Sequence, residues 1–232
     1  IKNFIKLPQY NNKNFTVERV IIITGNKPRF SKTNQEFDIQ ECIKLFHLYL
    51  KAANLTDLVE IRVGWRTQDL PVFVRMIDKD SNWGLNNGLH TLITTLLQMN
   101  MNGYSMVLPD MVGGNGYQGS PPAELFVRWL QANVFMPSIQ FSYVPWDYSN
   151  VTQFNVSSIS RTFVNLHQRY APYIKAVMER SVSEGTPVNP PIWWIAPNDT
   201  EALGTDTEFL LGEDILVAPV IIEGARSRAV YL

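Results

Sequence analysis

Two short apolar runs that lead into aspartates, with a helical pattern between them, constrain the fold of this chain most strongly. Residues 72–77 end at Asp78, and residues 104–108 end just before Asp110. Between them, over residues 85–99, leucine and isoleucine recur at helical spacing and not at the alternate positions of a strand. A strand, a helix and a second strand form a βαβ unit with parallel strands. The pattern predicts an α/β protein with acidic residues at the carboxyl ends of parallel strands, where (β/α) barrels place their sites.

The remaining pattern continues this alternation of strands and helices. Further strands are expected at residues 17–24, 58–63, 135–143 and 187–197, and helices at residues 38–53, 122–131 and 157–183, the last kinked or split by Pro172. Residues 111–119 form a glycine-rich loop whose glycines permit positive φ at the barrel mouth. Residues 209–222 read as strands of a β-rich region. We therefore expect a barrel portion over residues 1–200, and the barrel end with the start of a β-domain over 201–232.

Composition excludes several classes of partner. The 20 basic and 21 acidic residues leave a formal net charge of −1, so nothing favours nucleic acid or an anionic membrane surface. The lone Cys42 allows no disulfide within the chain, and no His, Cys and Asp set has metal-ligand spacing. We therefore expect neither a metal nor a cofactor. The sequence gives no oligomeric state.

The chain carries several candidate N-glycosylation triplets. Asn-x-Ser/Thr begins at Asn14, Asn54, Asn150, Asn155 and Asn198. Each triplet is a weak signal by itself, but five in a chain of this size favour a glycoprotein of the secretory lumen or the exterior.

Polar residues gather around the two aspartates that follow the strands. A single aspartate after a strand most often caps a turn or a helix. That reading weakens when two arginines and a tryptophan share the same segments. The candidate set is Arg62, Arg75, Asp78, Trp83 and Asp110. Pattern alone therefore predicts a polar site at one face of an α/β protein.

Four blocks of residues carry a family resemblance: 62–68; 78–83; 103–115 with 124–129; and 192–197 with 209–219. On these blocks the chain resembles glycoside hydrolase family 31, retaining enzymes that act on α-linked sugars, from about residue 60 to its end. The resemblance implies a partial (β/α)8 TIM barrel, the C-terminal half, leading into a β-rich C-terminal region. It implies a carbohydrate with an α-linked sugar as the partner, and a membrane anchor outside this chain.

The resemblance also assigns roles to the candidate residues. Family members use two carboxyl groups about 5 Å apart, one as nucleophile and one as acid/base. Asp78 takes the acid/base position, with Asp80 as a nearby rival, and a raised pKa at Asp78 would favour that role. The implied sugar-binding residues are Arg62, Arg75, Trp83 and Asp110, the last supporting the site from the next strand.

The nucleophile is the main departure from the family pattern. It is expected at the end of the strand that includes residues 20–23, where this chain has Thr24, whose unactivated hydroxyl is a poor nucleophile. The nearest acids are Glu18, at the wrong end of that strand, and Asp38, which caps the next helix. Ser142 stands where several relatives carry a sugar-binding histidine.

Three hypotheses follow from these residues. The first is a retaining α-glycosidase acting on α-galactosides or α-glucosides. The second is a catalytically inactive homologue that binds glycans or acts as a regulatory protein. The third is an α/β domain whose polar strand ends are turn chemistry, and the specific phrase at residues 209–219 makes it the weakest.

Overall fold

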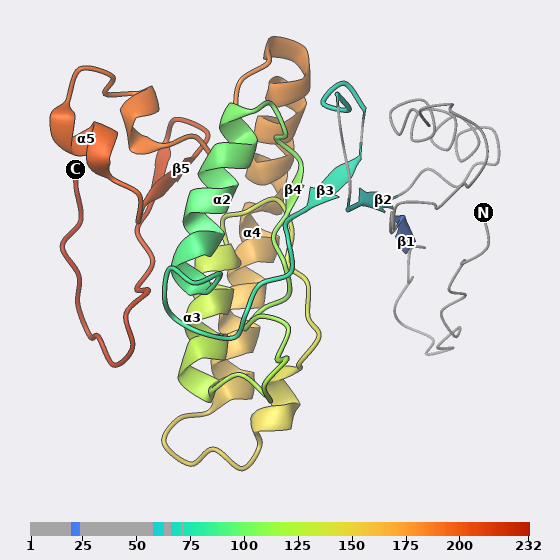
Figure 1. Ribbon diagram of the computed structural model, residues 1–232, viewed down its shortest axis with the longest axis vertical. Helices are drawn as coiled ribbons and strands as arrows, with labels where there is room; N and C mark the ends of the chain where they lie inside the picture. The colour runs from blue at the N-terminus through green and yellow to red at the C-terminus, as the bar shows by residue number, and fades with distance from the viewer. Residues whose placement is uncertain (1–19, 24–57, 63–65, 71) are drawn as a thin grey trace, which may run out of the picture.

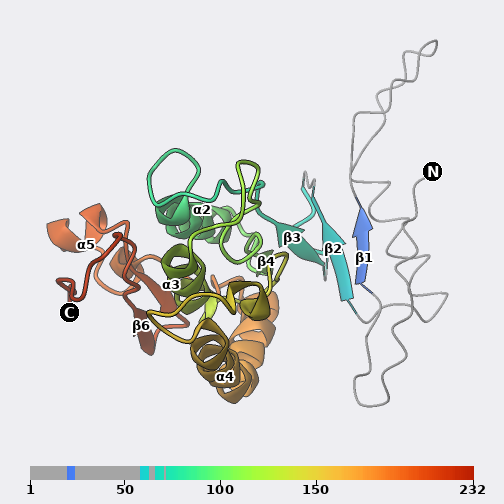
Figure 2. The same cartoon turned by 90° about the horizontal axis from the view of Figure 1, so that it is seen from below.

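A parallel sheet forms one side of the molecule. The structure, a computed structural model, describes residues 20–23, 58–62, 66–70 and 72–232. Its four strands are β1 (Val20–Ile23), β2 (Leu58–Ile61), β3 (Phe73–Arg75) and β4 (Val107–Leu108). They pair in chain order, and each neighbouring pair is parallel. The sheet extends away from the helices toward β1 in both views (Figures 1 and 2). The predicted parallel βαβ arrangement is confirmed.

Three helices pack beside the sheet and hold the core. They are α2 (Leu89–Met101), which connects β3 to β4, α3 (Ala123–Asn133) and α4 (Val156–Glu184). They run side by side through the middle of the molecule (Figure 1). Their apolar faces are buried because leucine and aromatic residues recur at helical spacing. The fully buried members include Leu89, Leu92, Ile93 and Leu96 of α2 and Leu125, Phe126, Trp129 and Leu130 of α3.

The helix boundaries differ in two places from the prediction. Helix α2 begins only after Gly88, and residues 85–87 form a turn in which Leu85 is 70% exposed and lies outside the core. Helix α4 continues through Pro172 as one helix, with Asn155 accepting a hydrogen bond at its start and Gly185 in the left-handed region at its end. The alternative of a split at Pro172 is therefore wrong.

The C-terminal part lies on the other side of α2 from the sheet (Figure 2). It contains the 3-10 helix η2 (Ile192–Trp194), the short helix α5 (Thr200–Gly204), and the antiparallel pair β5 (Phe209–Leu211) and β6 (Ile215–Val217). The hairpin confirms the strands predicted in residues 209–222. The division between residues 200 and 201 stays a prediction.

Two predicted strands are wrong. Residues 135–143 form irregular backbone, and Pro137, which has no N–H, interrupts any ladder there. In this segment Gln140 accepts one hydrogen bond, from the Val112 N–H at 2.9 Å. Residues 187–197 hold four prolines and fold around η2, so Trp193 and Trp194 do not alternate across a strand. The predicted helix at residues 38–53 lies outside the described residues.

Candidate functional site

Asp78 presents a partly open carboxylate three residues beyond Arg75, the residue that ends strand β3. Its side chain is 30% exposed. Arg62, which follows β2, donates to Oδ1, and the Tyr117 hydroxyl donates to Oδ2 at 2.8 Å. The Asn87 side-chain amide donates to the Asp78 carbonyl oxygen at 2.7 Å and fixes the backbone. Among the described residues each carboxylate oxygen therefore has one hydrogen-bond donor, and the group is partly exposed to solvent.

Arg75 lies beneath Asp78 and joins three carboxylates. Its guanidinium is 2.5 Å from Asp110 Oδ1, 3.6 Å from Glu60 Oε1 and 4.0 Å from Asp78 Oδ1. The side chain is only 8% exposed. Parallel pairing of β2, β3 and β4 brings these residues together, because it places the ends of neighbouring strands at one edge of the sheet.

Asp110 supports the site from a fully buried position. It accepts hydrogen bonds from Arg75, from the Lys79 backbone N–H at 2.6 Å, and from the Asn115 side chain. Its carboxylate thus ties β3, the segment after it and the glycine-rich loop to one another. With no exposed surface, Asp110 acts on a ligand only through these neighbours.

The glycine-rich loop brings Tyr117 to the site. Gly113, Gly114, Gly116 and Gly119 all have positive φ, which confirms the predicted role of these glycines. Gly114 also packs so closely that a Cβ atom there would lie 2.9 Å from the backbone after Asp78. The loop is thereby held against the segment that carries the open carboxylate.

Trp83 lies apart from the other candidate residues. It packs against the hydrophobic core and lines a cavity of about 740 Å³ between residues 83–90 and residues 219–229. Asp78, Arg62 and Tyr117 are not among the described residues that line this cavity. The structure therefore brings Arg62, Arg75, Asp78 and Asp110 into one cluster. Trp83 instead packs on the core and lines the cavity.

Charge and hydrogen bonding set the ionisation of the site. Burial acts to raise the pKa of Asp78, but the hydrogen bonds from Tyr117 and Arg62 outweigh it, and the pKa lies below its ordinary value. The Tyr117 pKa is raised by its bond to the Asp78 carboxylate. The direction at Asp78 is opposite to the one that would favour a general acid. The lowered pKa favours the ionised form of Asp78.

Glu60 of strand β2 is a further buried carboxylate beside Arg75. Glu60 is 1% exposed, and neither of its oxygens has a hydrogen-bond partner in the described part of the chain. Burial raises its pKa and outweighs the attraction of Arg75 and Arg62. Sequence analysis missed Glu60 and Tyr117. Glu60 precedes Arg62 by two positions and so shares its strand face, which is the one signal that could have indicated it.

Asp110 and Glu60, the other two carboxylates that contact Arg75, are both buried. The candidate nucleophile position Thr24, with Glu18 and Asp38, lies outside the described part of the chain. Ser142 is exposed. In the same described ranges, no group of three His, Cys, Asp or Glu residues could hold a metal ion, and no helix is long and apolar enough to cross a membrane.

Comparison with known families decides the identity of the fold. Residues 77–177 match the glycosyl hydrolases family 31 TIM-barrel domain, and residues 185–232 match the glycosyl hydrolase family 31 C-terminal domain. Together these stretches make up well over half of the chain. The chain belongs to glycoside hydrolase family 31. It holds part of the family's TIM-barrel domain, followed by the C-terminal domain.

Individual relatives agree with this assignment. The mouse myogenesis-regulating glycosidase is 41% identical over 185 residues, 75% of this chain and 25% of the relative. The SITS-binding protein of Tetronarce californica is 37% identical over 185 residues, 79% of this chain and 26% of the relative. The crystal structure of a family 31 α-xylosidase from a soil metagenome, complexed with xylose, superposes with a TM-score of 0.71 at 26% identity, covering 83% of this chain and 32% of that one. The chain thus spans about a quarter of the length of the curated relatives it matches.

Proposed function

We propose that the Asp78 site is the acid/base half of a retaining α-glycosidase site that acts on α-galactosides or α-glucosides. One observation carries the proposal: a solvent-accessible carboxylate stands at the carboxyl end of a barrel strand, held by a cation from the neighbouring strand. In family 31 this is the position of the acid/base, which gives a proton to the glycosidic oxygen. The α-xylosidase relative bound to xylose supports a sugar as the ligand.

In this proposal Asp78 gives a proton to the leaving glycosidic oxygen and then takes one from the attacking water. Arg62 orients the carboxylate and offers its remaining N–H groups to sugar hydroxyls, since its side chain is 34% exposed. Arg75 and Asp110 hold this arrangement from below. The reaction also needs a nucleophilic carboxylate about 5 Å from Asp78.

A second candidate function is sugar binding without hydrolysis, in a glycan-binding or regulatory protein. Two observations favour it. The sequence has Thr24 where the family nucleophile is expected, and the Asp78 pKa is below its ordinary value, which disfavours the protonated form that a general acid needs. A site of this kind would keep the sugar contacts of Arg62 and Asp78 and leave the glycosidic bond intact.

Hydrolysis of aryl α-galactoside and aryl α-glucoside by the purified protein separates the two functions. The glycosidase predicts turnover that falls at least 100-fold in Asp78→Asn and persists in the matched control Asp80→Asn, which removes the neighbouring rival carboxylate. Absence of turnover in a folded protein, with sugar binding still measurable by calorimetry and lost in Asp78→Asn, would establish the binding function. Equal turnover by both variants would refute the assignment of Asp78.

We further propose that the protein is a glycoprotein of the secretory lumen or the exterior. The support is the set of triplets at Asn150, Asn155 and Asn198, all of which are exposed. Expression in animal cells followed by enzymatic removal of N-glycans tests this. A fall in apparent mass, reduced by Asn198→Gln, is expected, whereas an unchanged mass would contradict it.

A further inference from the structure

The two oxygens of Asp78 are held by donors of different kinds. Oδ1 faces the guanidinium of Arg62, and Arg75 approaches the same oxygen at 4.0 Å. Oδ2 faces only a neutral hydroxyl, that of Tyr117, at 2.8 Å among the described contacts. An arginine guanidinium has donors and no acceptor, so a proton on Oδ1 would weaken the bond that this oxygen accepts from Arg62. Oδ2, whose described partner is a hydroxyl, is the favoured place for a proton.

The Tyr117 hydroxyl lies at hydrogen-bond distance from Oδ2, as a glycosidic oxygen would also have to lie to be protonated there. A general acid must lie within hydrogen-bond distance of the oxygen that it protonates. With Tyr117 bonded to Oδ2, no second group can approach that oxygen from the same direction. The hydroxyl and a bound glycoside therefore compete for one place on Asp78.

The tyrosine can leave without movement of its loop. Its side chain is 65% exposed, so rotation into solvent meets little packing. The loop itself is fixed on both sides of the tyrosine. The Asn115 N–H bonds to the Lys79 carbonyl at 2.9 Å, the Gly116 N–H bonds to Ser81 Oγ at 2.9 Å, and the Gly119 N–H bonds to the Gly116 carbonyl at 2.9 Å.

We propose that Tyr117 is a positioning residue whose hydroxyl holds Oδ2 of Asp78, as in this structure, and is displaced when an α-linked sugar binds. This inference rests on the proposed sugar site. After displacement, Oδ2 takes one proton from solvent, while Oδ1 keeps its bond to Arg62. Sugar binding thereby breaks the hydrogen bond from Tyr117 that stabilises the Asp78 carboxylate. Protonated Asp78 is then favoured when the sugar is bound.

The groups that act on Asp78 support this coupling. Burial raises its pKa, whereas the hydrogen bonds from Tyr117 and Arg62 and the charges of Arg62 and Arg75 lower it. Removal of the Tyr117 bond leaves burial opposed by the two arginines alone. The pKa of Asp78 must then rise. Because the loop stays in place, the change is confined to one hydrogen bond.

Titration of the Asp78 carboxyl carbon by NMR tests the inference without need for turnover. Selectively 13C-labelled protein is titrated as wild type and as Tyr117→Phe, with Asp78→Asn to assign the signal. The matched control is Tyr173→Phe, which removes a similar bond of 2.6 Å to Asp214 on another part of the molecule. Tyr117→Phe is expected to titrate at higher pH than wild type, and Tyr173→Phe to leave the Asp78 titration unchanged.

A sugar probe tests the displacement. Methyl α-galactoside and methyl α-glucoside at saturating concentration are expected to move the wild-type Asp78 titration to higher pH and to move that of Tyr117→Phe less. Identical titration of wild type and Tyr117→Phe, or a wild-type titration that neither sugar moves, would overturn the inference. Failure of the proposed hydrolysis appears separately, as absent turnover of the aryl glycosides.

Discussion

Replacement of Lys79 by methionine should change how the stability of the protein depends on pH. Lys79 follows Asp78 directly and is 1% exposed. Its ammonium group bonds to the Thr91 hydroxyl at 3.0 Å, the Thr91 carbonyl at 3.2 Å and the Thr95 hydroxyl at 2.9 Å, all on helix α2. The side chain thus anchors the segment that carries Asp78 to the helix beside it.

The magnitude follows from the pKa of this buried amine. Burial lowers it from 10.5 to about 8, although the charge of Asp110 acts in the opposite direction. A shift of this size corresponds to about 3 kcal/mol of the free energy of unfolding. Because the folded-state pKa is depressed, the stabilising contribution is fully present above pH 10.5 and is lost as the pH falls through about 8. At pH 7 the protein bears nearly the whole cost of burying the charge.

Urea unfolding of wild type and Lys79→Met at several values between pH 7 and pH 10 measures this cost. The stability of the variant relative to wild type should fall by about 2 to 3 kcal/mol over this range, because only wild type gains stability as Lys79 loses its proton. Lys175→Met is the control, since that lysine is 77% exposed. The difference in the free energy of unfolding between this variant and wild type should not change with pH over this range. A flat difference for Lys79→Met as well would refute the reasoning.

Three further substitutions probe other buried contacts. Arg228→Met leaves the carboxylate of Glu208, 2% exposed and 2.5 Å from the guanidinium, without its partner, and should lower the free energy of unfolding by about 3–5 kcal/mol in urea. The Asn100 Oδ1 accepts hydrogen bonds of 2.9 Å from two buried backbone N–H groups. Asn100→Ala leaves both unpaired and should lower the free energy of unfolding by about 2–4 kcal/mol in thermal unfolding. Gly116→Ala places a Cβ at positive φ and 2.3 Å from the Tyr143 hydroxyl, so calorimetry should show a loss of about 1–3 kcal/mol. A change below about 0.5 kcal/mol in any of these would contradict the corresponding contact.

Local patterns predicted the elements whose stability depends on nearby residues. The helices α2, α3 and α4 follow from apolar spacing within each segment, and the parallel pairing of β3 and β4 follows from the helix between them. Apolar composition alone misled the prediction at residues 135–143 and 187–197. Prolines in both segments remove backbone donors, which short apolar runs need before they can join a sheet.

Side-chain contacts across long sequence separation could not be predicted in the same way. Asp110 was named from its position after a strand, and Arg75 was assigned from the family resemblance. The parallel pairing of β3 and β4 sets Arg75 opposite Leu108, and the Arg75 guanidinium lies 2.5 Å from Asp110. Tyr117 lies 39 positions from Asp78, on a loop without regular pattern. Its contact depends on the path that positive-φ glycines give the loop, and no spacing rule encodes that path.

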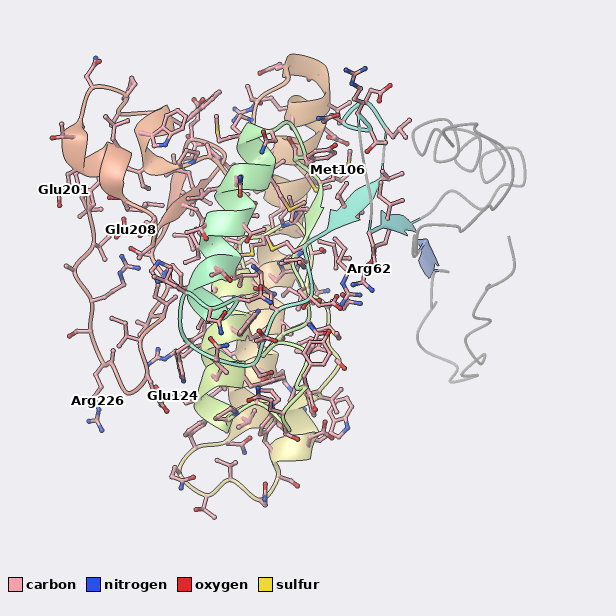
Figure 3. The ribbon with its side chains drawn as sticks, viewed as in Figure 1. Arg62, Met106, Glu124, Glu201, Glu208 and Arg226 are labelled. Atoms are coloured by element: carbon pink, nitrogen blue, oxygen red, sulfur yellow. The ribbon has the colours of Figure 1, made fainter. Side chains whose placement is uncertain are left out.

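Figure 3 shows Arg62 beside β2 and β3 and Glu208 on the far side of α2, so the ion pairs that these two residues make lie on different sides of that helix. Near the sheet, Arg75 makes its shortest contacts with Asp110 and leaves Asp78 at 4.0 Å. A carboxylate bonded directly by two guanidinium groups could hardly take a proton at neutral pH. Asp78 is bonded directly by one, and its second oxygen meets a hydroxyl that can leave. Under the proposed glycosidase function, the bond between Arg75 and buried Asp110 would favour protonation of Asp78, because it holds the second cation at 4.0 Å from the carboxylate.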